Sequence, residues 1–129
     1  MTIESYRDLR VWQRAVDLAE QVYRVTGEFP REEQFGLTIQ VRRAVVSVSS
    51  NIAEGHGRKH RADFLRFLSI SRGSLMEVET QLEIARRLAY VSSAQYQELN
   101  ANCQDVGRLL NGLIRALENR HPGPISSET

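Results

Sequence analysis

The feature that most constrains this chain is the recurrence of apolar residues at every third or fourth position along four long segments. This spacing places apolar side chains on one face of an α-helix, whereas a half-buried strand alternates at every second residue. The predicted helices cover residues 8–26, 31–55, 61–88 and 92–117. Because the connections between them are short, we expect an all-α, up-down-up-down antiparallel four-helix bundle.

The ends of the predicted helices carry residues that begin or stop a helix. Gly27 and Pro30 follow the first helix and end its pattern. The pair Glu32–Glu33 falls in the first turn of the second helix, where the helix dipole favours acidic side chains. Ser92 and Gln95 match an S-x-x-Q capping box, which predicts the start of the fourth helix.

The first predicted helix has a wider apolar face than a single bundle needs. Its apolar residues form two parallel rows. One row is Leu9, Trp12, Val16, Ala19 and Tyr23, and the other is Val11, Ala15, Leu18, Val22 and Val25. Because a four-helix monomer can bury only part of this face, the excess predicts a subunit interface and therefore a homo-oligomer.

The length of 129 residues fits one domain, which we place at residues 1–120, followed by a flexible tail, HPGPISSET, at 121–129. The single cysteine, Cys103, excludes an intrachain disulfide and lies at an apolar position, where we expect it to be buried and inert. No run reaches the roughly 18 apolar residues of a membrane span. We therefore expect a cytoplasmic protein without membrane contact. A net charge of +1 leaves any nucleic-acid surface to local clustering.

Polar residues follow one face of the second predicted helix, beside its apolar row. They are Gln40, Arg43, Ser47, Asn51 and Glu54, spaced by three or four residues. If the second and third helices form a hairpin that turns near residue 60, facing positions have numbers that sum to about 120. Ser47 then falls opposite Gly73, and two small residues there would let the backbones approach closely.

The same register predicts two interhelical ion pairs. Arg43 falls opposite Glu77, and Glu54 falls opposite Arg66. Three interpretations stay open: a structural network, a surface that contacts a ligand or subunit, and a catalytic cluster of Arg43, Asn51, Glu54 and Glu77. General acid–base catalysis needs a pocket and a group with a shifted pKa, and the sequence indicates neither. We therefore assign no catalytic residue.

A locally basic segment follows the second predicted helix. Its basic residues are Arg58, Lys59, Arg61, Arg66 and Arg72, and Asp63 is the only acid between residues 56 and 72. Such local density suits phosphate contacts, so these five are the candidate nucleic-acid-binding residues. The alternative is a solvated loop, because such runs are common on protein surfaces. A homo-oligomer would favour nucleic-acid binding over a solvated loop, because the repeated loops could form one basic ring.

The remaining motifs do not indicate an enzyme or a metalloprotein. His56 and His60 are four residues apart, but Gly55 and Gly57 indicate that the helix ends here, which removes the spacing that a metal would need. We therefore predict loop histidines and no metal site. No nucleophile–base motif or phosphate-binding glycine loop is present, so we expect no cofactor.

With these residues set out, the chain resembles the 23S ribosomal RNA intervening sequence proteins, a bacterial family of four-helix bundles. The resemblance covers residues 5–118 and rests on YRDLRVWQRAVDLAEQVY, FPREEQFGLTIQVRRAVVSVSSNIAEG and FLRFLSISRGSLMEVETQLEIARRL. Its most specific pattern is Gln40, Arg43, Ser47, Asn51, Ile52, Ala53, Glu54 and Gly55, together with Gly73, Ser74 and Glu77. One departure is the start of the third helix, where the family often has a Ser cap and this chain has His60 and Arg61.

The resemblance implies a bundle that is commonly assembled as a homopentamer and has no established enzymatic activity. It also implies a distant similarity to the accessory protein of diversity-generating retroelements, a basic pentamer that binds nucleic acid and a reverse transcriptase. We therefore expect a non-enzymatic oligomer that binds RNA or other nucleic acid through the basic segment. The alternative is a protein-interaction adaptor, for example for a reverse transcriptase, without a direct nucleic-acid role.

Overall fold

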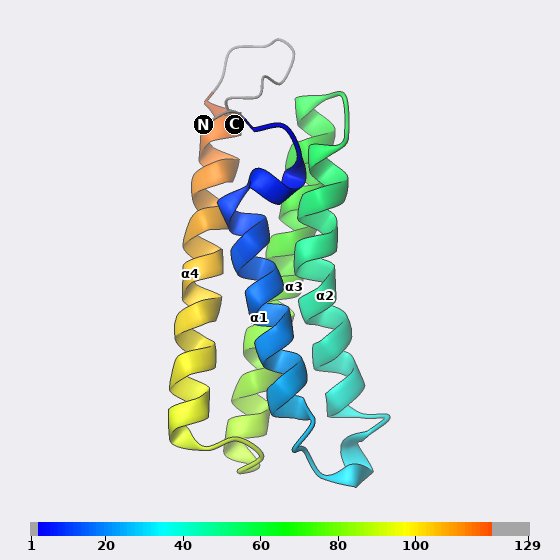
Figure 1. Ribbon diagram of the computed structural model, residues 1–129, viewed down its shortest axis with the longest axis vertical. Coiled ribbons are helices and arrows are strands. Elements are labelled where there is room, and N and C mark those ends of the chain that lie inside the picture. The colour runs from blue at the N-terminus through cyan, green and yellow to red at the C-terminus, as the bar shows by residue number, and fades with distance from the viewer. Residues whose placement is uncertain (1–2, 120–129) are drawn as a thin grey trace.

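A computed structural model of the protein describes residues 3–119 (Figure 1). Within this range it contains the helices α1 (Arg10–Thr26), α2 (Leu37–His56), α3 (Arg61–Arg87) and α4 (Ser93–Glu118), and no strand. Two short 3-10 turns, η1 (Tyr6–Asp8) and η2 (Arg31–Glu33), precede α1 and α2. Successive helices run in opposite directions, so the predicted all-α four-helix bundle is confirmed.

Each helix packs against two others, so the four helices lie at the corners of a square. α2 packs most extensively on α3, and further contacts join α1 to α2, α3 to α4 and α1 to α4. The turn between α2 and α3 therefore lies at the same end of the bundle as the start of α1 and the end of α4 (Figure 1). Basic residues that are far apart in the sequence can meet at this end.

The two apolar rows on α1 are buried to different depths: in the row that begins with Leu9, Leu9 itself is buried and Trp12 and Ala19 pack partly buried against the core. Val11, Ala15, Leu18 and Val22 are buried, whereas Val16 and Tyr23 remain 37% and 43% exposed. Tyr23 is partly covered from α2, because the Arg42 guanidinium lies 4.6 Å from the centre of the Tyr23 ring. Arg42 also donates hydrogen bonds to the Thr26 hydroxyl at 2.8 Å and to the Tyr23 carbonyl at 3.2 Å.

The start of α2 differs from the prediction. The helix begins at Leu37 rather than near residue 31, because Gly36 has φ −111° and ψ −115°, which interrupts a helix. The Glu33 carboxylate lies before the helix and accepts a hydrogen bond from the Leu37 backbone N–H at 3.0 Å. Glu33 therefore caps the helix from outside and does not sit in its first turn.

The connection between α3 and α4 contains both a confirmed and an unpredicted feature. The Ser92–Gln95 capping box is present, with the Gln95 N–H donating to the Ser92 hydroxyl at 3.1 Å and the Ser92 N–H to the Gln95 side chain at 2.9 Å. α3 ends at Arg87, close to the predicted residue 88. Two residues later Ala89 has φ 61°, a left-handed conformation that L-residues adopt at a cost.

The hairpin of α2 and α3 has the predicted register. The hydroxyls of Ser47 and Ser74 share a hydrogen bond of 2.8 Å, and the Ser71 hydroxyl donates to the Val48 carbonyl at 2.7 Å. The numbers in these pairs sum to 121 and 119, close to the predicted 120. The prediction of a close approach at Gly73 is wrong, since a Cβ atom there would meet nothing within 4 Å.

The helices otherwise agree with the interpretation of the sequence where the structure describes them. Cys103 is buried, and burial raises the pKa of its thiol to about 12. No helix in residues 3–119 is long and apolar enough to cross a membrane. The tail predicted at residues 121–129 lies outside the described residues.

Candidate nucleic-acid interface

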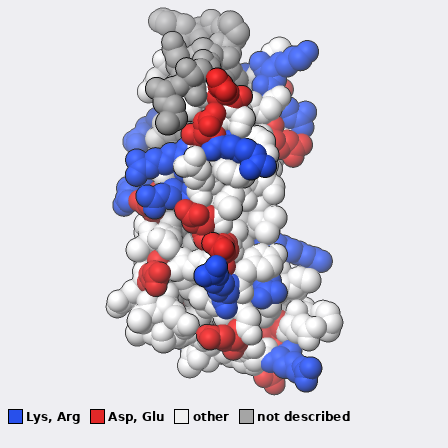
Figure 2. Space-filling model, viewed as in Figure 1, with Lys and Arg blue, Asp and Glu red and all other residues white. Residues whose placement is uncertain are grey.

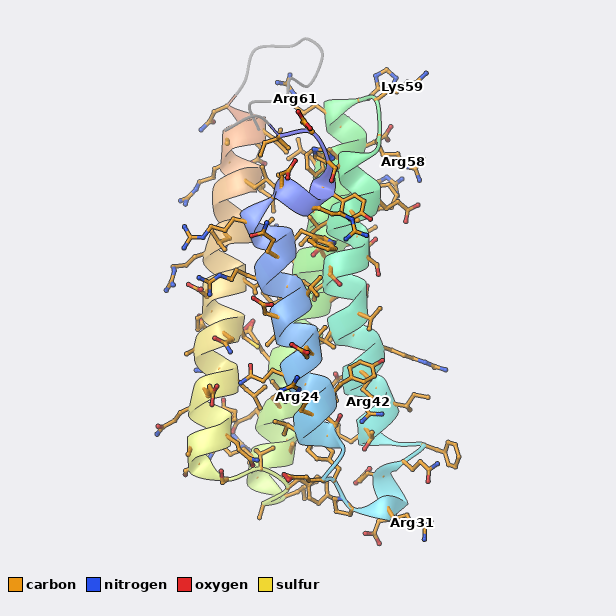
Figure 3. The ribbon with its side chains drawn as sticks, viewed as in Figure 1. Arg24, Arg31, Arg42, Arg58, Lys59 and Arg61 are labelled. Carbon is orange, nitrogen blue, oxygen red and sulfur yellow. The ribbon has the colours of Figure 1, made fainter. Side chains whose placement is uncertain are left out.

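The basic segment lies on a short turn at one end of the bundle. Gly57 ends α2, and its N–H donates to the carbonyls of Ala53 and Glu54. Only residues 58–60 separate it from α3, which His60 precedes in an extended conformation. Lys59 and His60 are exposed. Figure 3 shows Arg58 and Lys59 directed outward from this turn. The chain reversal thus places basic side chains where a large ligand can reach them.

Two arginines cover the same aromatic ring beside the turn. The guanidinium carbon of Arg58 lies 4.8 Å and that of Arg66 lies 4.6 Å from the centre of the Phe67 ring. Phe67 itself is 7% exposed. The attraction between a cation and the face of an aromatic ring restricts where both guanidinium groups can lie. The two charges therefore share one small area of surface above a buried ring.

The ion pair predicted between Glu54 and Arg66 is not the one that forms. The Glu54 carboxylate pairs with Arg58, four residues later, at 2.9 Å, while Arg66 turns to the Phe67 ring. The side chains of Arg58 and Glu54 are 45% and 56% exposed. A partner one turn away is reached without any constraint from the hairpin register, which explains why the local pair is made.

The five predicted nucleic-acid-binding residues do not all lie together. Arg58 and Lys59 lie in the turn, and Arg61 begins α3 beside it, half-buried. Arg66 lies on α3, where its guanidinium meets the Phe67 ring as that of Arg58 does. Arg72 lies eleven residues after Arg61 and six after Arg66 on α3, or roughly 16 Å and 9 Å at 1.5 Å per residue. Its side chain donates a hydrogen bond of 3.1 Å to Asn111 on α4. Arg72 is therefore separate from the other four candidate residues.

The fold adds basic residues that the sequence analysis missed. Arg7 in η1, Arg10 in the first turn of α1 and Arg115 in the last turn of α4 lie at the same end as the α2–α3 turn (Figure 1). Acidic side chains lie beside the basic ones there (Figure 2). The Asp8 carboxylate is already used locally, because it accepts the backbone N–H groups of Glu4 and Ser5. We call Arg58, Lys59, Arg61 and Arg66 the basic turn.

His56 is the last residue of α2 and not a loop residue, so the prediction of two loop histidines is wrong for this one, and its ring faces an aromatic neighbour. Its ring lies 5.7 Å from the Phe64 ring in an edge-to-face arrangement. Burial lowers the pKa of His56, opposed by the negative charge of Asp8. Among residues 3–119 no group of three or more His, Cys, Asp or Glu side chains is arranged to hold a metal ion.

The polar residues of α2 divide into a bonded pair and an open groove. The Asn51 side chain donates to the Ser47 carbonyl at 2.8 Å and to the Ser47 hydroxyl at 2.9 Å. A groove of about 290 Å³ runs between α2 and α3, lined by Gln40, Arg43, Ala44, Ser47, Ser74, Glu77 and Gln81. Neither Asn51 nor Glu54 lines it. We call it the α2–α3 groove.

The predicted ion pair across this groove does not form. Arg43 and Glu77 line the same groove, as the register requires, but both are exposed and neither is ion-paired within residues 3–119. An exposed pair gains little in water, and ordering two long side chains opposes it. The candidate catalytic set of Arg43, Asn51, Glu54 and Glu77 is therefore not gathered in one place.

Comparison with known proteins places this arrangement in a family. The family model described as 23S rRNA-intervening sequence protein matches residues 7–112. A solved structure from Bacteroides thetaiotaomicron, described as a protein with unknown function from the S23 ribosomal protein family, is 26% identical in sequence. The match covers 81% of this chain and 95% of that one, with a TM-score of 0.76. No curated protein matches the chain.

Proposed function

Because the chain belongs to the 23S rRNA-intervening sequence protein family, we propose that it is a non-enzymatic, oligomeric protein that binds RNA or other nucleic acid through the basic turn. The observation that carries the proposal is the placement of Arg58 and Arg66 on one buried ring, next to the exposed Lys59. These side chains offer guanidinium and ammonium donors to phosphate oxygens at one end of the bundle. We expect the protein to act in the cytoplasm, which suits its single buried thiol.

The chemistry of the basic turn favours contacts to the backbone of a nucleic acid. Phe67 is buried beneath two guanidinium groups, so it offers no free face on which a base could stack. Contacts to phosphates carry little sequence information and release counterions from the nucleic acid. We therefore expect binding that is weakly selective for sequence and that falls steeply as the salt concentration rises.

Assembly of several copies would support this function, because the basic turn of one copy has only four cations, one of them paired with Glu54. The net charge of the chain is only +1, and Arg58 is partly neutralised by Glu54. A homo-oligomer, such as the pentamer that the family resemblance implies, repeats the basic turn around a common axis. Repetition multiplies the number of phosphates that one particle contacts and so raises its affinity. The exposed Val16 and Tyr23 on α1 offer apolar surface for such contacts.

The test compares two variants that lose the same charge at opposite ends of the bundle. In the first, Arg58, Lys59 and Arg61 are changed to Ala. In the control, the exposed Arg24, Arg31 and Arg87, which belong to the opposite half of the bundle, are changed to Ala. Binding of a fluorescent, structured RNA is measured by anisotropy at about 50 and 200 mM salt, a range over which phosphate contacts weaken strongly.

The expected result is weaker binding only in the first variant, with a log–log salt slope that becomes shallower by about one for each lost phosphate contact. Circular dichroism should show both variants folded. Equal affinity in the first variant and the wild-type protein would remove the basic turn from the interface. If the wild-type protein ignores RNA at low salt, the adaptor function becomes the better explanation.

A further inference from the structure

A pocket of about 300 Å³ lies between the end of α1, the turn η2 and the start of α2, and we call it the η2 pocket. It lies at the end of the bundle opposite to the basic turn (Figure 3). Its polar lining comprises Thr26, Arg31, Gln34, Thr38 and Arg42, and no Asp or Glu in residues 3–119 lines it. Two cations without an acid among the lining residues favour an anionic ligand, and a cleft of this size suits a small molecule.

The Thr38 hydroxyl has no hydrogen-bond partner within residues 3–119, although the residue is only 9% exposed. Thr26, which lines the same pocket, shows the usual arrangement, because its hydroxyl donates to the Val22 carbonyl at 2.7 Å. Thr38 lacks this option, since a helical threonine relies on a helix carbonyl one turn earlier and α2 begins only at Leu37. A buried hydroxyl without a partner costs free energy. A ligand in the η2 pocket can supply the partner, because Thr38 lines it.

Arg42 is held in place at the wall of the same pocket. Its Nε donates to the Thr26 hydroxyl at 2.8 Å, its Nη2 donates to the Tyr23 carbonyl at 3.2 Å, and its guanidinium covers the Tyr23 ring. Its Nη1 has no hydrogen bond and the side chain has no ion pair within residues 3–119. A guanidinium that is fixed before a ligand arrives loses little freedom on binding, so Arg42 is prepared to receive an anion.

Arg31 and Gln34 add further donors to the η2 pocket. Both are exposed, and neither side chain has a hydrogen bond or an ion pair within residues 3–119. The acids Glu32 and Glu33 are close in sequence but do not line the pocket. The Glu33 carboxylate is used elsewhere, because it accepts hydrogen bonds from the first N–H of α2 at 3.0 Å and from the Tyr90 hydroxyl at 2.8 Å. The donors of the pocket are therefore not neutralised by the acids beside it.

We propose that the η2 pocket binds the phosphate group of a small phosphorylated molecule. A phosphate monoester carries three terminal oxygens and close to two negative charges at neutral pH, so it can accept hydrogen bonds from both guanidinium groups and from the Thr38 hydroxyl. A carboxylate has only two oxygens and one charge. Thr38 belongs to the first turn of α2, where the partial positive charge of the helix end adds to the attraction. This site goes beyond the proposed function and uses no residue of the basic turn.

The test measures binding of inorganic phosphate, glycerol phosphate and acetate at constant ionic strength, near neutral pH. Affinity for the two phosphates is followed by phosphorus NMR, and the melting temperature is measured with each of the three anions. Arg31→Ala removes an exposed guanidinium from the η2 pocket, and Thr38→Val replaces the hydroxyl by a methyl group of similar volume. Arg24→Ala is the matched control, because it removes one exposed arginine from the same end of the bundle and does not line the pocket (Figure 3).

We expect both phosphates to raise the melting temperature of the wild-type protein, and Arg31→Ala and Thr38→Val each to weaken phosphate binding about tenfold. Arg24→Ala should keep the wild-type affinity. Without phosphate, Thr38→Val should melt no lower than the wild-type protein, because its hydroxyl has no hydrogen bond to lose; a lower melting temperature would assign the hydroxyl a structural role and overturn the site. The site is also overturned by unchanged phosphate affinity in Thr38→Val, by acetate that stabilises the protein as much as phosphate does, or by a wild-type protein that rejects glycerol phosphate.

RNA binding distinguishes the η2 pocket from the basic turn. The variant in which Arg24, Arg31 and Arg87 are changed to Ala lacks one arginine of the pocket. Retained RNA affinity in that variant, together with weakened phosphate binding, supports a small-molecule site that is separate from the nucleic-acid interface. Loss of RNA affinity there would overturn the small-molecule assignment, because the pocket would then take its phosphate from nucleic acid. A wild-type protein that binds glycerol phosphate but ignores RNA would refute the proposed function and support the pocket.

Discussion

A Cβ atom built on Gly55 of α2 would lie 2.7 Å from the Cβ atom of Phe67 on α3. The same atom would lie 3.0 Å from the Phe64 ring and 3.4 Å from the Phe64 carbonyl. Glycine therefore allows the two helices to approach closely just before the basic turn. Because the nearest atom belongs to the base of a buried side chain, the neighbour cannot move away without shifting α3.

We expect Gly55→Ala to destabilise the protein by about 1–2 kcal/mol, as overpacking at about 1–3 kcal/mol exceeds the helix propensity that alanine gains. Gly112→Ala is the control, because a Cβ atom there meets nothing within 4 Å. That variant should gain up to about 1 kcal/mol from helix propensity alone. Chemical denaturation of both proteins measures the difference. Equal stabilisation of the two variants would show that α3 can yield at Phe67.

Ala89 offers the opposite kind of substitution. Its φ of 61° is a left-handed conformation that costs an L-residue roughly 1–2 kcal/mol. Glycine removes this cost. Its greater conformational freedom in the unfolded chain, however, lowers the free energy of unfolding by about 0.4–1 kcal/mol. Ala89→Gly should therefore raise the free energy of unfolding by up to about 1 kcal/mol in a thermal melt. Ala101→Gly, inside α4, should lower it by about 1 kcal/mol, and a loss in both variants would contradict the strain at Ala89.

His56 predicts a loss of stability in mildly acidic solution. Burial holds its pKa below the ordinary value of 6.5, so the unfolded chain binds the proton more tightly than the folded protein. The free energy of unfolding is therefore unaffected by His56 above pH 6.5, where the imidazole is neutral in both states. It decreases as the pH drops below that value, because the unfolded chain takes up the proton first. The melting temperature of His56→Gln should therefore fall less than that of the wild-type protein between pH 7.5 and 5.5.

His60 provides the control for this measurement, because it is exposed at the start of α3. His60→Gln should keep the pH dependence of the wild-type protein. A His56→Gln variant whose melting temperature changes with pH as much as that of the wild-type protein would assign the acid sensitivity to other groups.

Glu83 predicts a second loss of stability at lower pH. Its carboxylate accepts hydrogen bonds from Arg86, Arg87 and Tyr96, and these lower its pKa to about 2. The folded pKa is thus below the ordinary value of 4.5, so the contribution of Glu83 is present above pH 4.5 and is lost as the pH falls toward 2. Between those values, the stability of Glu83→Gln should depend less on pH than that of the wild-type protein.

The matched control is Glu118→Gln, an exposed carboxylate at the end of α4. Acid titration followed by circular dichroism compares the three proteins between pH 5 and 2. A Glu83→Gln variant that follows the wild-type curve throughout would show that the three donors do not stabilise the ionised carboxylate in solution.

The sequence was most informative where local spacing decides the structure. The apolar period of three and four residues predicted all four helices, and the Ser92–Gln95 pair predicted the start of α4. The hairpin register followed from a turn near residue 60 and agrees with the Ser47–Ser74 hydrogen bond. Each of these features depends on residues close in sequence, or on one short turn that fixes the positions of two helices.

The same reasoning failed where several partners compete for one side chain. Glu54 could reach Arg66 across the hairpin or Arg58 along its own helix, and the register alone does not choose between them. Arg72 looked like part of the basic run, but it lies six residues beyond Arg66 on α3, roughly 9 Å at 1.5 Å per residue, and donates a hydrogen bond to Asn111 on α4. Exposed ion pairs differ little in free energy, so the choice depends on side-chain geometry.

The sequence by itself determined that this chain is a four-helix bundle, which helices pair, and that a basic segment lies at their turn, because helical period, caps and short turns act over a few residues. Only the tertiary structure decided that Gly55 makes the close approach, that Arg7 and Arg115 join the basic end, and that Arg43 and Glu77 share an open groove. These relationships arise from the packing of all four helices, which brings together residues that no local pattern connects.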